Sequence, residues 1–118
     1  MTNRLHALTF DCADAATLGE FWAQVLGEKL DAGATKEFAS VGSEDSGRTE
    51  PCWYFVQVPE GKTAKNRFHP DLVTEDLPAE VERLIGLGAT RKADVEMGNM
   101  RWTTLLDPEG NEFDVMAG

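Results

Sequence analysis

The order strand, helix, three strands occurs twice along this chain, and this repetition constrains the fold more than any other feature of the sequence. In the first half, residues 5–12 alternate apolar and polar side chains, as a strand does. Asp14 offers a helix-capping carboxylate, and Gly27 offers a left-handed helix stop. The apolar residues between them have the spacing of one helix face: Leu18, Phe21, Trp22 and Val25. Three strands are predicted to follow, over residues 29–32, 36–41 and 52–58.

After a polar link over residues 59–66, the same order begins again. A strand is predicted over residues 67–74, followed by a helix that Asp76 caps and that carries Pro78 in its first turn. Its apolar positions are Val81, Leu84 and Ile85, and it ends at Gly86-Leu87-Gly88. The last three strands are predicted over residues 89–95, 100–106 and 112–116.

This duplication predicts an α+β fold made of two βαβββ modules, at residues 4–58 and 67–117. A single module would leave the inner face of its sheet uncovered, so we expect both modules within one domain spanning residues 1–118. The expected architecture is a curved mixed sheet with the two helices on its outside. A chain of 118 residues can bury a sufficient core without a disulfide, and Cys12 and Cys52 are predicted to be buried, reduced thiols.

The excess of acidic residues indicates which classes of partner this protein can bind. The chain has 21 acidic and 11 basic residues and a formal net charge of −10, which repels nucleic acid and anionic membrane surfaces. No apolar stretch is long enough to cross a bilayer, and charged residues stand where a secretion signal would be apolar. We therefore expect a cytoplasmic protein with no nucleic-acid or membrane partner.

Three motifs resemble the vicinal oxygen chelate superfamily of glyoxalases, bleomycin-resistance proteins and dioxygenases, in particular its small glyoxalase-like bacterial members. They are FDCAD at residues 10–14 with FWAQVLG at 21–27, KNRFHPDL at 65–72, and LDPEGNEFD at 106–114. Their order along the whole chain implies the paired-module fold of that superfamily. The resemblance does not imply one activity, because this fold hosts isomerases, dioxygenases, epimerases, transferases and proteins that only sequester drugs.

The resemblance also implies a place for one divalent metal ion. Superfamily members that do chemistry hold the ion with side chains from the first, fourth, fifth and eighth strands. The first position falls on Ala7, which has no donor atom, and the neighbouring His6 is expected to point toward a helix. The other positions fall on Gln57, His69 and Asp114, which are the implied ligands, and His69 and Asp114 are also the candidate catalytic residues.

Strand alternation extends this set to a predicted pocket. Asp71 points to the same side as His69, and Glu112 to the same side as Asp114. The candidate substrate-binding residues are Trp53, Phe55, Gln57, Asp71, Arg101, Thr103 and Glu112. Two interpretations stay open: a loosely held divalent metal with several waters, or no cofactor and a hydrogen bond from His69 to Asp114 or Asp71. A standard glyoxalase I is not expected, because the first-strand ligand and the last-strand glutamate are both absent.

The leading hypothesis is a protein that binds a small organic molecule in the cup of its sheet, with lyase or isomerase activity if it is an enzyme. An alternative is sequestration of a cationic drug without chemistry, which the net charge and the aromatic residues Trp53, Phe55 and Trp102 favour. A regulatory or structural module is a third interpretation. By analogy with relatives built from two such modules, we expect a homodimer.

Overall fold

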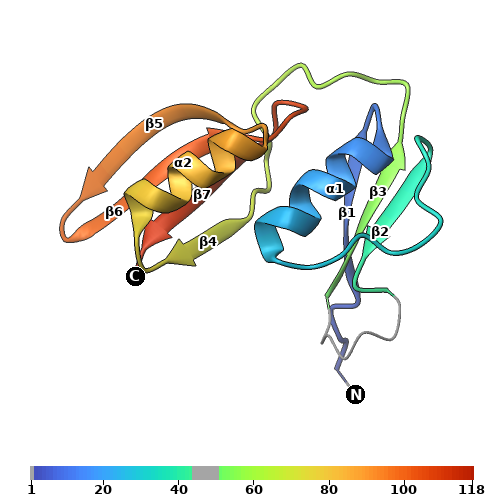
Figure 1. Ribbon diagram of the computed structural model, residues 1–118, viewed down its shortest axis with the longest axis horizontal. Coiled ribbons are helices and arrows are strands. Elements are labelled where there is room, and N and C mark those ends of the chain that lie inside the picture. Colours follow the sequence, from blue (N-terminus) through green and yellow to red (C-terminus); the bar gives the residue numbers. More distant parts are fainter. Residues whose placement is uncertain (1, 44–50) are drawn as a thin grey trace. The chain divides into compact units, whose positions relative to one another are not determined.

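The structure is a computed structural model that describes residues 2–43 and 51–118 (Figure 1). The chain divides into two compact units, one ending at Gly61 and the other beginning at Lys62. Each unit contains one mixed sheet and one helix that packs against it.

The first unit contains a three-stranded sheet. Its elements are β1 (Ala7–Cys12), α1 (Ala15–Leu26), β2 (Phe38–Val41) and β3 (Cys52–Gln57). The strand order is β1-β3-β2, with β1 parallel and β2 antiparallel to β3. The strand predicted over residues 29–32 is reduced to one isolated bridge between Leu30 and Val41, because the chain turns at Gly33, whose φ is +88°.

Helix α1 begins and ends where the sequence predicts. The Asp14 carboxylate accepts a hydrogen bond from the Thr17 N–H at 3.1 Å, and Gly27 adopts a left-handed φ of 68°. Trp22 is fully buried, and its ring lies 5.4 Å from that of Phe10 and 5.3 Å from that of Trp53. Burial of these aromatic groups contributes to the stability of this unit.

The second unit contains a four-stranded sheet. Its elements are β4 (Asp71–Thr74), α2 (Leu77–Leu87), β5 (Thr90–Met97), β6 (Met100–Leu106) and β7 (Glu112–Ala117). The strand order is β4-β7-β6-β5, with β4 parallel to β7 and the other pairs antiparallel. The predicted strand over residues 67–74 begins only at Asp71, because Pro70 has no N–H to donate to a neighbouring strand.

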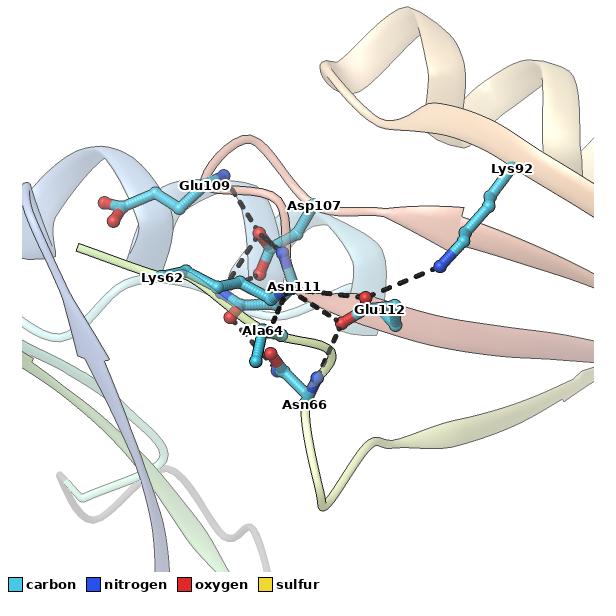
Figure 2. A network of polar contacts seen from close by, with 8 residues as sticks. All are labelled: Lys62, Ala64, Asn66, Lys92, Asp107, Glu109, Asn111 and Glu112. Carbon is cyan, nitrogen blue, oxygen red and sulfur yellow. Dashed lines mark hydrogen bonds and ion pairs between the residues drawn. The ribbon is translucent and has the colours of Figure 1, made fainter.

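The DPEGN motif forms the tight turn into β7. Asp107 is 3% exposed, and its Oδ1 accepts hydrogen bonds from the backbone N–H groups of Glu109 and Asn111 (Figure 2). The side-chain amide of Asn111 also donates to this carboxylate, at 2.9 Å and 3.1 Å. Gly110 completes the turn with a φ of +86°. The motif is therefore structural: one buried carboxylate fixes the start of β7.

The predicted α+β fold of two βαβββ-like modules with two helices is confirmed, and its strands form two mixed sheets, one in each unit. Both cysteines are buried, and each thiol donates to a carbonyl, Cys12 to Val56 and Cys52 to Gly42. None of the helices in the described residues is long and apolar enough to span a membrane. That the two modules make up a single domain stays a prediction.

Candidate metal centre

The face of the second sheet that is turned away from α2 carries a row of polar side chains. Phe113 and Val115 of β7 are fully buried on the side that α2 covers, so alternation sends Asp114 to the opposite face. The strand register places Asp114 beside Asp71 of β4 and Thr104 of β6. Three neighbouring strands therefore present polar groups side by side.

His69, which lies just before β4, completes this cluster. Its Nδ1 atom lies 3.0 Å from Oδ1 of Asp71 and 3.9 Å from Oδ2 of Asp114. One ligand atom from each of the three residues can be chosen so that all lie within 4.8 Å of one another. The structure thus brings His69, Asp71 and Asp114 together at the edge of the second sheet.

The Nδ1 atom of His69 is buried and has no hydrogen-bond partner among residues 2–43 and 51–118. Asp71 is close enough for a hydrogen bond, but the direction of its approach does not suit one. A buried polar atom without a partner costs free energy, and two carboxylates close together repel each other unless a cation lies between them. An imidazole nitrogen with two carboxylate oxygens fits a divalent metal ion.

Thr104 also belongs to this cluster, although it is not among the residues predicted from the sequence. Its hydroxyl donates a 2.6 Å hydrogen bond to Oδ1 of Asp114, which leaves Oδ2 on the side of His69. The signal that could have identified Thr104 is the register of the β6–β7 hairpin, in which Thr104 lies directly opposite Asp114.

Glu112, a predicted substrate contact, forms a hydrogen bond and ion pairs within the protein (Figure 2). Its side chain is buried, and Oε1 accepts a 3.0 Å hydrogen bond from the Asn66 N–H. Lys62 lies 3.3 Å from Oε1 and Lys92 lies 3.6 Å from Oε2. Burial by itself would raise the pKa of Glu112, but hydrogen bonds from the Asn66 N–H, its own backbone N–H and Lys62 lower the pKa to about 2. Glu112 is therefore charged at neutral pH and anchors residues 62–66 to β7.

The position predicted for Arg101 and Thr103 is wrong. Thr103 pairs with Val115 rather than with Asp114, which places its side chain on the face that α2 covers. Its hydroxyl donates to Asp94 at 2.8 Å, and Arg101, two residues away on β6, shares this face. An offset of one residue along a strand exchanges its two faces, and the prediction made this error.

The face predicted for Trp53, Phe55 and Gln57 in the first unit is also wrong. The parallel register places Phe55 beside Phe10, and Trp53 and Phe55 are both buried in the core against α1. The side-chain amide of Gln57 donates to the Ala13 carbonyl, in the turn that leads into α1, at 3.0 Å. None of the three lies on the open face of its sheet, where the prediction placed them.

His6 does not point toward α1 as expected. Its side chain is exposed, and its Nε2 lies 3.3 Å from the Tyr54 hydroxyl. Tyr54 pairs with Ser40 and Thr9 and alternates with the buried Trp53, so it lies on the face away from α1. His6 precedes the first residue of β1, and strand alternation therefore does not fix its direction.

The fold resembles solved structures along its whole length. A glyoxalase/bleomycin resistance protein/dioxygenase family enzyme from Burkholderia phytofirmans is 22% identical, with a TM-score of 0.75 and 98% of each chain covered. The fosfomycin resistance protein FosX from Listeria monocytogenes is 15% identical, with a TM-score of 0.74, and the match covers 100% of this chain and 95% of FosX. A bleomycin-binding protein from Streptomyces verticillus, solved with copper(II)-bleomycin, is 20% identical, with a TM-score of 0.63. The match covers 100% of this chain and 99% of that protein.

At these levels of identity the solved structures bear on the fold alone. No curated protein matches the sequence significantly. The glyoxalase-like domain family, however, matches residues 7–116, which is almost the whole chain. The chain therefore belongs to the glyoxalase-like domain family.

Proposed function

We propose that this protein binds one divalent metal ion through His69, Asp71 and Asp114, and with it a small organic molecule that it converts in a lyase or isomerase reaction. The observation that carries the proposal is the buried Nδ1 atom of His69, which faces two carboxylates and has no hydrogen-bond partner in the described part of the chain. The residue types fit an ion that accepts nitrogen and oxygen ligands, such as Mn²⁺ or Mg²⁺.

Each residue has a role in this proposal. Nδ1 of His69, Oδ1 of Asp71 and Oδ2 of Asp114 hold the ion, and Thr104 orients Asp114 through its other oxygen. When bound, a divalent ion polarises oxygen atoms of the organic ligand as a Lewis acid. The side chains of His69 and Asp71 are 33% and 54% exposed, which leaves room for the ligand and for water.

The proposed ligand set differs from the one that the superfamily resemblance implies. Asp71 takes the place of both Gln57 and the first-strand position, where Ala7 has no donor atom. All three ligands then come from the second unit, which supplies His69 from the segment before β4, Asp71 from β4 and Asp114 from β7.

The test is isothermal titration of chelator-treated protein with Mn²⁺, Ni²⁺, Zn²⁺ and Fe²⁺. Wild type should bind one ion per chain, and His69→Ala should abolish saturable binding. The matched control is His6→Ala, which removes the other of the two histidines and should leave binding unchanged. Absence of saturable binding by wild type, or equal binding by His69→Ala, would contradict the proposal.

A second candidate function is capture of a cationic drug without chemistry. The net charge of −10 favours it, as does the fold shared with the bleomycin-binding protein. Trp53 and Phe55 lie in the core, so of the three aromatic residues expected to stack on such a drug only Trp102 stays partly exposed. Expression in a sensitive host, challenged with cationic glycopeptides, tests this function; unchanged resistance would count against it.

We also infer a homodimer. Within the described residues, β4 and β5 are the edge strands of the second sheet, and unpaired edges favour association with another chain. Sedimentation velocity at micromolar concentration should give the mass of two chains. A single species with the mass of one chain would contradict this inference.

A further inference from the structure

A cavity of about 390 Å³ lies on the other side of the second sheet from His69 and Asp114. It is lined by the first turns of α2 and by the β5–β6 hairpin, both of which belong to the second unit. Its apolar lining includes Leu77 and Val81, and its charged lining consists of Arg91, Asp94, Glu96 and Arg101. Cavities of this size hold small organic molecules in many proteins.

Part of the charged lining is satisfied within the protein. Asp94 accepts a 2.7 Å hydrogen bond from the Arg91 guanidinium and a 2.8 Å hydrogen bond from the Thr103 hydroxyl. The two donors hold this carboxylate in place, so Arg91 and Asp94 neutralise each other without a ligand.

Glu96 and Arg101 differ from that pair. They lie directly opposite each other in the antiparallel register of β5 and β6, where opposite charges ordinarily attract. Neither side chain forms an ion pair or a hydrogen bond with another residue in the described stretches of the chain. The cavity therefore presents one carboxylate and one guanidinium close together, beside an apolar surface.

We propose that this cavity binds a zwitterionic molecule with an apolar tail, of the class of the aliphatic α-amino acids. The ligand carboxylate pairs with Arg101, whose guanidinium offers two parallel N–H donors. The ligand ammonium group pairs with Glu96, and the apolar tail lies against Leu77 and Val81. The two arginines and two acidic residues of the lining cancel in charge, which suits a ligand with no net charge better than a simple anion or cation.

This site is independent of the proposed metal centre. Thr103 and Asp114 lie on opposite faces of the sheet, and no residue of the cavity lining is a proposed metal ligand. Binding should therefore persist in the presence of a chelator and in the His69→Ala variant.

The experiment is a titration of ¹⁵N-labelled full-length protein with L-leucine in EDTA, followed by heteronuclear NMR. We expect saturable shifts of the backbone amides of Val81, Glu96 and Arg101. Glu96→Gln and Arg101→Gln should each weaken binding on the order of tenfold, since each removes a hydrogen bond between charged groups. The matched control is Arg83→Gln on the exposed side of α2, which should bind like wild type. The spectra themselves report whether each variant is folded.

Three related compounds separate the contributions of the ligand. N-acetyl-L-leucine lacks the ammonium group, L-leucinamide lacks the carboxylate and glycine lacks the tail, so each should bind more weakly than L-leucine. The proposal is overturned if no amide near the cavity shifts, if the shifts gather around His69 and Asp114 instead, or if Glu96→Gln and Arg101→Gln bind L-leucine like wild type.

Discussion

The hydroxyl of Thr104 donates a 2.6 Å hydrogen bond to Oδ1 of Asp114, so this carboxylate is held by one oxygen while the other faces His69. Aspartate is one methylene shorter than the last-strand glutamate that the resemblance to the vicinal oxygen chelate superfamily implies. A fixed orientation is therefore more important for Asp114 than it would be for a longer side chain.

Replacing Thr104 should weaken metal binding without removing a ligand. Thr104→Val keeps the shape of the side chain but cannot donate, and residues that orient a ligand typically contribute about 10- to 100-fold to metal affinity. Thr104→Ser retains the hydroxyl and should restore most of the affinity. Isothermal titration with Mn²⁺ measures both variants. Equal affinity of wild type and Thr104→Val would show that the hydrogen bond does not position Asp114 for the ion.

Asp71 and Gln57 distinguish the proposed ligand set from the one that the resemblance implies. Asp71→Asn keeps the size of the side chain but loses its charge, so Mn²⁺ affinity should fall on the order of tenfold or more. Gln57→Ala should leave affinity unchanged, because the Gln57 amide is directed to the Ala13 carbonyl beside α1. The opposite result would place the ion with the ligands that the resemblance implies.

Glu112 should make stability depend on pH in the acid range. Its pKa is about 2 in the folded protein and 4.5 ordinarily, so its contribution is complete above about 4.5 and is lost as the pH falls toward 2. Glu112→Gln should reduce the free energy of unfolding at pH 7 by about 1 to 3 kcal/mol, since hydrogen bonds to a charged group are lost.

Urea denaturation of both proteins in EDTA, from pH 7 to the lowest pH at which wild type folds, tests this expectation. The difference between wild type and Glu112→Gln should shrink as the pH falls below about 4.5. A difference that is constant with pH would mean that the charge of Glu112 does not stabilise the fold.

The Asp107 carboxylate should be essential for the turn into β7. Asp107→Ala removes the acceptor of two backbone N–H groups and of the Asn111 amide, and leaves these donors unsatisfied in a partly buried turn. We expect a loss of about 2 to 4 kcal/mol of unfolding free energy. Glu82→Ala, at an exposed position of α2, is the control and should change stability by less than about 0.5 kcal/mol. Similar urea midpoints for the two variants would contradict the role given to Asp107.

Local signals in the sequence predicted most of the fold. Asp14, Gly27 and Asp76 mark the helix ends through contacts within a few residues, and the DPEGN turn depends on five consecutive residues. Alternation places Asp71 and Asp114 on one face of the second sheet, and His69 meets them although it lies just before β4.

The wrong predictions concern the sheet faces of side chains, which no local sequence pattern determines. The face on which Trp53 lies depends on the register between β1 and β3, which are far apart in sequence. The face on which Thr103 lies depends on the register of the β6–β7 hairpin. In both cases a shift of one residue moves the side chain to the other face of the sheet. The partners of Glu112, Lys62 and Lys92, are 50 and 20 positions away and become visible only in the folded chain.

The most direct test of the metal centre is anomalous scattering from crystals of the protein grown with Mn²⁺. We predict one strong peak within about 2 to 2.5 Å of Nδ1 of His69, a carboxylate oxygen of Asp71 and Oδ2 of Asp114. No peak at this position, or a peak whose ligands exclude His69, would contradict it.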